Sequence, residues 1–207
     1  MDEPLRLTLL YSANIAGDLK LLPRLYTFLR QLQPLERQHT LLLDLGRSCR
    51  ADIAHCRETG GRSTLIVLDG MGYHAANIAG ALDRENRDKL AEIVTMGLVD
   101  ETEEWIYCVP PIRDPSIRVT LRPRDDGARL QVILKPAAST RIEGNALYLE
   151  EVGAGQVGEA VIDLRGAPCL LRASIHPMPP DTPPNPSIAG AVEFVEAEAR
   201  YYARQAR

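Results

Sequence analysis

The sequence predicts an α/β protein in which a layered sheet sandwich is covered by helices. Within residues 1–100, apolar segments typical of buried strands alternate with amphipathic segments typical of helices. Residues 101–180 instead contain a series of short strand-like segments, and a terminal helix is expected over 186–206. We therefore expect one domain over residues 1–207, with two subdomains that meet near Asp100 as the alternative.

The first half alternates in the order strand, helix, strand, helix, strand, helix, which favours a parallel sheet with right-handed crossovers. Apolar side chains recur at helical spacing between the first two strands, and Asp83 is a suitable N-cap for the third helix. The predicted strands are Leu5–Tyr11, Thr40–Leu45 and Ala75–Ala79, and the predicted helices are Leu19–Leu32, Arg62–Met71 and Asp83 to about Met96.

The second half is β-rich and closes with a helix. Its predicted strands are Trp105–Val109, Ile117–Arg122, Arg129–Leu134, Ala146–Glu150, Val157–Leu164 and Cys169–Ile175. Asp125-Asp126-Gly127 has the composition of a hairpin-type turn between two of these strands. Asn185 is a good N-cap for the closing helix, and Pro186 suits its first position.

Composition excludes several classes of partner. The formal net charge is -4 and the isoelectric point is about 5.6, which argues against nucleic acid or an anionic membrane as a partner. No apolar run reaches the roughly 18 residues that a membrane span needs. The N-terminal sequence MDEPLRLTLLYSAN has acids where a signal peptide needs positive charge, so we expect a cytoplasmic protein.

Three loops that follow strands carry the functional prediction. Their sequences are YSANIAG over 11–17, LLLDLGR over 41–47 and MGYHAANIAGAL over 71–82. In order and spacing these loops resemble the motifs of the calcineurin-like metallophosphoesterases, specifically their 5'-nucleotidase branch. The resemblance covers about residues 5–85. Residues 177–207 are weakly similar to the segment that closes the catalytic domain of this family. The chain as a whole is therefore similar to a truncated metallophosphoesterase domain.

The departures from the family pattern all fall on its chemistry. The resemblance implies that the first loop should offer a metal-binding Asp and His, the second a bridging Asp, and the third a ligand Asn and a His. Those positions hold Asn14, Ala16, Arg47, Gly80 and Ala81. Two neighbouring divalent cations need a shared carboxylate, and a guanidinium repels them instead. We therefore expect no metal site, no cofactor and no catalytic residue.

The same loops define a candidate ligand-binding cleft. Arg47 could bind a phosphate or a carboxylate without metal; the alternative is that it pairs with a nearby acid such as Asp44 or Asp18. For Asp44 and His74 we favour a structural role over a catalytic one. The predicted cleft residues are Ser12, Asn14, Gly17, Asp44, Arg47, His74 and Asn77.

The cysteines are widely spaced and form no CxxC motif. In a reducing compartment we expect Cys49, Cys56, Cys108 and Cys169 to be free thiols packed as small hydrophobic side chains. Cys49, His55 and Cys56 are close enough in sequence to bind zinc, but no second ligand pair with the usual spacing follows. We therefore favour free thiols, with His39 and His55 as exposed loop residues.

The resemblance and its departures together predict a non-catalytic, 5'-nucleotidase-like pseudoenzyme. We expect it to bind a small anionic ligand or a protein partner, and to self-associate through sheet surface that a full-length domain would cover. One alternative is a phosphoester hydrolase with an atypical site around Arg47, Asp44 and His74. The other is a structural or assembly subunit.

Overall fold

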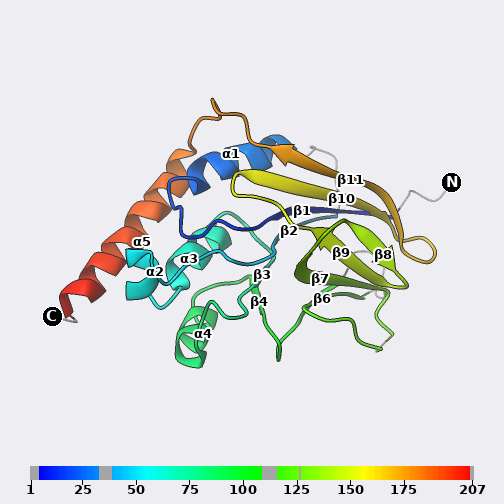
Figure 1. Cartoon of the computed structure of the whole chain (residues 1–207), viewed down its shortest axis with the longest axis horizontal. Coiled ribbons are helices and arrows are strands. Elements are labelled where there is room, and N and C mark those ends of the chain that lie inside the picture. Colours follow the sequence, from blue (N-terminus) through cyan, green and yellow to red (C-terminus); the bar gives the residue numbers. More distant parts are fainter. Residues whose placement is uncertain (1–4, 33–38, 109–115, 126, 206–207) are drawn as a thin grey trace.

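The computed structural model describes residues 5–32, 39–108, 116–125 and 127–205 (Figure 1). Two sheets pack face to face, and helices cover the outer face of the larger sheet (Figure 1). This is the mixed α/β arrangement of layered sheets and helices that the sequence predicts. No helix in the described ranges is both long and apolar enough to cross a membrane.

The larger sheet has the strand order β11-β10-β1-β2-β3-β4. Strands β1 to β4 run parallel, which confirms the prediction from the alternating first half, and β10 and β11 extend the sheet antiparallel beside β1. The bounds are β1 (Arg6–Ser12), β2 (Thr40–Asp44), β3 (Ala75–Asn77), β4 (Gly97–Val99), β10 (Gln156–Asp163) and β11 (Cys169–Pro177).

The helices are α1 (Leu22–Leu32), α2 (Ala54–Glu58), α3 (Arg62–Gly70), α4 (Arg84–Ala91) and α5 (Pro186–Gln205). Asp83 caps α4 as predicted, but this helix ends at Ala91 instead of Met96, and β4 follows it. The predicted cap of α5 is confirmed, because the Asn185 side chain accepts hydrogen bonds from the amides of Ser187 and Ile188. Residue 206, the predicted end of this helix, lies outside the described residues.

The smaller sheet has the strand order β5-β6-β7-β9-β8. Its strands are β5 (Trp105–Cys108), β6 (Ser116–Thr120), β7 (Leu130–Ala137), β8 (Arg141–Glu143) and β9 (Ala146–Glu150). Strands β6 and β7 are parallel, so the predicted hairpin at Asp125-Asp126-Gly127 is wrong. Asp126 itself lies outside the described residues. A turn-forming composition fixes a change of direction but not which strand the chain meets next.

Each central strand faces two cores. In β1, Leu7, Leu9 and Tyr11 pack toward the smaller sheet, whereas Leu10 packs toward the helices. This alternation follows from the two-residue period of a strand, and both cores are fully buried here. Because β1, β2 and β3 are parallel, the loops that follow them meet at one edge of the sheet, which is where open α/β sheets place their ligand sites.

Candidate functional site

The loops that follow β1 and β2 lie side by side and are joined through their backbones. The hydrogen bonds run from Asn14 N to Gly46 O (3.1 Å), from Ala16 N to Arg47 O (2.8 Å) and from Gly17 N to Ser48 O (2.8 Å). Two motifs about 30 residues apart in the chain therefore form one continuous platform at the carboxyl edge of the sheet.

The backbone of this platform is unusual. Asn14 (φ 58°), Ala16 (φ 55°) and Arg47 (φ 58°) are the non-glycine residues with positive φ in the part of the chain that the structure describes. Left-handed backbone costs an L-residue roughly 1–2 kcal/mol, and such conformations persist only where the surrounding structure enforces them. Here the interloop hydrogen bonds enforce them, and the clustering of strained residues marks this edge as the candidate site.

Arg47 sits at the centre of a small polar cluster. Its Nη1 donates to Glu151 Oε1 (3.0 Å) and to Asn14 Oδ1 (3.3 Å). Asn14 Nδ2 in turn donates to Glu151 Oε1 (3.1 Å) and to Val152 O (2.8 Å). The Arg47 side chain is 71% exposed and that of Glu151 is 47% exposed. The cluster is therefore open to solvent and able to meet a ligand.

Glu151 is the residue that sequence reasoning missed. Arg47 pairs with an acid, but with Glu151, which follows β9 in the other sheet, and not with Asp44 or Asp18. The available signal in the sequence was its position, because Glu151 is a charged residue directly after the predicted strand Ala146–Glu150. The pairing itself depends on how the two sheets pack, so the sequence pattern does not specify it.

Asp44 is a buried support for the platform. It is 0% exposed, and its Oδ2 accepts from the Gly46 amide (3.1 Å) and from the Ser48 hydroxyl. The Ser12 hydroxyl contacts its Oδ1 (3.5 Å) and bonds the Tyr73 hydroxyl (2.7 Å). Burial raises the pKa of Asp44 to about 7, although these hydrogen bonds act in the opposite direction. Neither Asp44 nor Ser12 reaches solvent, so both hold the turn in shape.

Asn77 joins the platform to the second sheet. Its Nδ2 donates to Leu45 O (3.0 Å) and to Leu134 O (3.1 Å), and its Oδ1 accepts from the Ala79 amide (3.0 Å). A Cβ on Gly46 would lie 3.1 Å from this side chain, which explains the small residue at that point of the second motif. Asn77 thus lies beside the platform, but both polar atoms of its side chain already bond to backbone groups.

His74 lies apart from the other predicted site residues. It precedes β3, at the opposite end of that strand from Asn77. Its Nδ1 accepts a hydrogen bond from the Leu42 amide (3.0 Å), and its ring centroid is 6.3 Å from that of Trp105. Burial lowers the pKa of His74. These contacts describe a neutral imidazole that fills space between strands.

After Asn77, the third motif has no side chain that could bind a metal ion or a polar ligand, because residues 78–82 are Ile, Ala, Gly, Ala and Leu. Gly80 has a positive φ of 71°, and Ala81 closes a turn in which its amide donates to Ile78 O (3.0 Å). A Cβ on Gly61 would lie too close to the Ala81 carbonyl, so this turn packs tightly against the start of α3. The two positions therefore contribute backbone packing.

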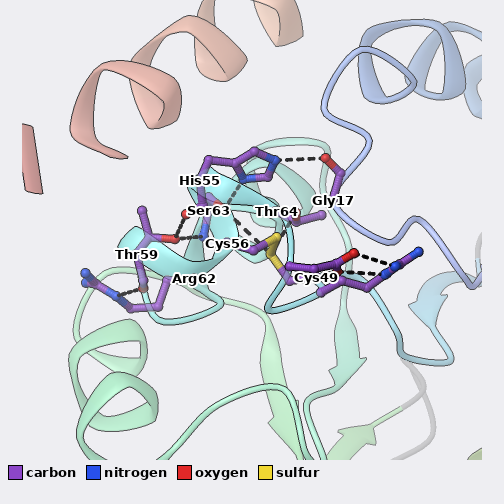
Figure 2. The surroundings of a disulfide bond; sticks show 10 residues. Gly17, Cys49, His55, Cys56, Thr59, Arg62, Ser63 and Thr64 are labelled. Atoms are coloured by element: carbon purple, nitrogen blue, oxygen red, sulfur yellow. Dashed lines mark hydrogen bonds and ion pairs between the residues drawn. A yellow bond between two sulfur atoms is a disulfide. The ribbon is translucent and has the colours of Figure 1, made fainter. Parts of the chain in front are cut away.

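The prediction of free thiols at Cys49 and Cys56 is wrong. These residues form a disulfide with a Cα–Cα distance of 5.7 Å (Figure 2). The chain folds back between them through α2, so residues seven apart in sequence meet in space. Cys108 and Cys169 are free but exposed, so they are not packed in the core. Exposed loop positions were predicted for His39 and His55, whereas His39 is buried and His55 is partly buried on α2.

Gly17 connects this disulfide to the platform. Its φ is 83°, and a Cβ there would lie 2.9 Å from Cys56 Sγ, so the loop after β1 tolerates only glycine at this point. His55 Nε2 lies 2.8 Å from the Gly17 carbonyl oxygen (Figure 2). Of the predicted site residues, Gly17 therefore has a structural role that the sequence motif alone did not explain.

Comparisons with known proteins agree with this fold. The chain matches no family model and no curated protein sequence. Among solved structures it is similar to the NAD nucleotidase NadN of Haemophilus influenzae, with a TM-score of 0.57 and 10% identity over 94% of this chain and 63% of that one. It is also similar to a 5'-nucleotidase precursor from Thermus thermophilus, with a TM-score of 0.61 and 12% identity over 98% of this chain and 59% of that one.

A third similar structure is the sulfate thiohydrolase SoxB of Thermus thermophilus, with a TM-score of 0.64 and 11% identity over 92% of this chain and 60% of that one. The chain thus spans less than two thirds of the length of each of these proteins. At such low identity the likeness establishes the fold. That fold is a layered α/β sandwich similar to the one in these proteins, and here the loops after β1 and β2 form a compact platform at the carboxyl edge of the parallel strands.

Proposed function

We propose that this chain is a non-catalytic protein with a 5'-nucleotidase-type fold, and that it binds a small anionic ligand through Arg47. The observation that carries the proposal is the position of Arg47. It takes the place of the bridging Asp in the resembled family, and its guanidinium is exposed at the edge where loops of both sheets meet.

The donor atoms at these positions do not fit a pair of divalent cations. Arg47 places a permanent positive charge where the shared carboxylate would be needed. Asn14 supplies a neutral oxygen that already accepts from Arg47, and the carboxylate of Glu151 is paired with the same guanidinium. The remaining equivalent positions hold alanine or glycine. The proposal therefore contains neither the metal pair nor any other cofactor.

Arg47 is suited to an anion instead. Within the described residues its hydrogen bonds use Nη1, which leaves Nε and Nη2 as a planar pair of donors for a carboxylate or phosphate. Asn14 and Glu151 already fix the guanidinium, so binding should cost little side-chain entropy. Glu151 also lowers the local positive potential, which should keep the affinity modest.

An atypical hydrolase built on Arg47, Asp44 and His74 receives no support from the geometry. Asp44 is 0% exposed, so its carboxyl group cannot meet a substrate. His74 lies at the far end of β3 with its Nδ1 committed to the Leu42 amide. A base and a nucleophile must lie within hydrogen-bond reach of the reacting group, and these residues do not share such a place.

Enzymatic assay tests the non-catalytic part of the proposal. The protein is incubated with Mn²⁺ and a panel of nucleotides and simple phosphomonoesters, with and without a chelator. We expect no release of phosphate above the protein-free rate. Turnover that scales with protein concentration and disappears with the chelator would overturn the proposal.

Thermal-shift measurements test the binding part. Inorganic phosphate, nucleotides and small carboxylates are screened against the wild type, Arg47→Gln and the control Arg50→Gln, whose arginine is also exposed but pairs with Asp52. We expect stabilisation of the wild type and the control by at least one anion, and its loss in Arg47→Gln. Glu151→Gln should strengthen binding because it removes the competing charge. A shift that is equal in Arg47→Gln, or no shift for any anion, would contradict binding at this site.

An assembly role is a second candidate, favoured by the exposed face of α5. Phe194 is 66% exposed and Tyr201 is 59% exposed, and their spacing of seven residues puts them on one side of the helix. The partner we propose is a second copy of this chain. An antiparallel pair of α5 helices would set Phe194 of one helix against Tyr201 of the other and would bring Glu193 near Arg204, which is complementary in charge.

Light scattering tests this second candidate. The chain mass is 22.9 kDa, and the expected mass in solution is twice that value at micromolar concentration. Phe194→Ser combined with Tyr201→Ser should give the monomer, whereas Leu171→Ser, which removes an exposed side chain on β11, should not. A monomeric wild type, or a dimer that survives the double substitution, would reject this interface.

A further inference from the structure

We propose that Cys49, His55 and Cys56 form a redox-controlled binding site for a soft divalent cation such as Zn²⁺. The site is closed while the two cysteines form a disulfide and opens when that disulfide is reduced. This inference is independent of the phosphoesterase-like platform and departs from the sequence-based expectation of no metal. It rests on the arrangement of three side chains around α2 (Figure 2).

The three side chains already converge. One potential ligand atom from each of Cys49, His55 and Cys56 lies within 4.8 Å of the others. Thiolate sulfur and imidazole nitrogen are the donors that Zn²⁺ prefers in proteins. Two sulfurs on one tetrahedral zinc lie about 3.8 Å apart, given Zn–S bonds of about 2.3 Å. A Cα–Cα distance of 5.7 Å allows that separation by side-chain rotation once the disulfide is open.

His55 is oriented as a metal ligand would be. Its Nε2 lies 2.8 Å from the Gly17 carbonyl oxygen, and a carbonyl only accepts hydrogen bonds, so Nε2 carries the proton. The other nitrogen, Nδ1, then holds a lone pair, which accepts from the Ser63 hydroxyl (2.7 Å). Metal-binding histidines typically donate their second N–H to a backbone carbonyl or a carboxylate, as here.

Two hydroxyl groups complete the surroundings of the sulfurs. Ser63 Oγ lies 3.7 Å from Cys49 Sγ and 2.7 Å from His55 Nδ1, so it stands between two of the proposed ligands. A cation that binds to these ligands would either displace the Ser63 hydroxyl or bind it as a further ligand. Thr64 Oγ1 lies 3.3 Å from Cys49 Sγ and can donate a hydrogen bond to a thiolate. Three protein ligands leave a fourth position for Ser63 or a water molecule.

The switch follows from balanced thiol chemistry. A dithiol reductant gives two electrons and two protons to the Cys49–Cys56 bond, so that two thiols form and the reductant becomes a disulfide. When Zn²⁺ binds, both thiols lose their protons and two metal–sulfur bonds form. Oxidation removes the two anionic donors and leaves His55 alone. The predicted cytoplasmic location would favour the reduced, ion-binding form, because that compartment keeps thiols reduced.

Zinc binding to the full chain tests the proposal. The protein carries Cys108→Ser and Cys169→Ser, which remove the exposed free thiols, and is prepared either oxidised or reduced with a phosphine that is then removed. Competition with a chromogenic chelator measures Zn²⁺ affinity, and Co²⁺ substitution reports sulfur ligation through its charge-transfer absorption. We expect one Zn²⁺ per chain in the reduced protein, and an affinity at least about 100-fold weaker in the oxidised protein.

Single-residue variants assign the site. Cys49→Ser should abolish the sulfur–cobalt absorption of one thiolate and weaken zinc binding, and His55→Ala should weaken zinc binding while both thiolate bands remain. Asp52→Asn, an exposed neighbour outside the ligand set, should bind as the parent does. The proposal is overturned if the reduced protein binds no Zn²⁺, if the oxidised protein binds it equally well, or if Cys49→Ser and His55→Ala leave the affinity unchanged.

Discussion

Three non-glycine residues in left-handed backbone, Asn14, Ala16 and Arg47, hold the platform in shape. Asn14, Ala16 and Arg47 share nearly the same φ, and each donates or accepts a backbone hydrogen bond across the two loops. The common feature of these three residues is thus a backbone conformation.

Replacing Ala16 should reveal the cost of that backbone. Glycine adopts φ of about +55° freely, so Ala16→Gly relieves the backbone strain of the folded state. Glycine also loses more backbone entropy on folding, which offsets part of that gain. The free energy of unfolding should therefore rise by about 0.5–1 kcal/mol. Ala197→Gly, in the exposed middle of α5, should lower it by a similar amount. Denaturant unfolding of both variants measures the difference, and a destabilised Ala16→Gly would contradict the strained turn.

Asp44 should make stability depend on pH. Burial raises its pKa from 3.8 to about 7, so the folded protein holds a proton that the unfolded chain has released. The contribution of Asp44 is therefore fully present below about pH 4 and is lost as the pH rises to about 7.

The corresponding measurement is denaturant unfolding at several pH values between 4 and 8 for the wild type and Asp44→Asn. The amide cannot ionise, and its oxygen can still accept from the Gly46 amide and Ser48. The decline of stability with rising pH should be shallower in Asp44→Asn. Parallel curves for the two proteins would show that Asp44 is not the group responsible.

Among the secondary-structure elements, the pairing of β1 with β10 depends on a glycine. Tyr11 and Gly158 are direct partners in this antiparallel pair, and the Tyr11 ring lies over Gly158, where a Cβ would clash with it. An aromatic ring over a glycine on a neighbouring strand fills the space that a side chain would otherwise occupy. This contact joins an early strand to a late one and fixes their register.

Gly158→Ala should therefore loosen the sheet. The added methyl group must displace the Tyr11 ring, and overpacking of this kind costs about 1–3 kcal/mol. Gly166→Ala is the matched control, because a Cβ at that loop position meets nothing within 4 Å. Thermal unfolding of the two variants compares them directly. Equal midpoints would show that the Tyr11 ring moves aside without cost.

The longer elements could be predicted from sequence, whereas most of the shortest could not, with the three-residue strand β3 as the exception. The apolar pattern over 19–32 and 186–206 indicates α1 and α5, because each has several turns of consistent period. The missed elements are α2, β4 and β8, each of three to five residues. A segment of three to five residues is too short to show a periodic apolar pattern, so tertiary contacts decide its conformation. Both β6 and β7 were predicted as strands, but their parallel pairing was missed because a turn-forming composition does not specify which strand the chain meets next.

At the scale of the whole molecule, the two sheets share one core. Leu147 on β9 is 0% exposed and belongs to the buried cluster that also contains Leu9 of β1. Leu147→Ala should lower the free energy of unfolding by about 2–5 kcal/mol, through lost burial and the cavity left behind. Leu171→Ala, 48% exposed on β11, should change it little. Unfolding in which one sheet melts before the other would contradict a shared core.

The amino-acid sequence predicts the order of the main elements, the parallel sheet, the layered α/β fold and the loops that carry the candidate site. These features follow from local periodicity and from motifs within a few residues. Tertiary packing brings Glu151 to Arg47, holds His74 apart from the platform and joins Cys49 to Cys56 beside His55. Such contacts depend on how distant loops and sheets pack, and no local pattern records that packing.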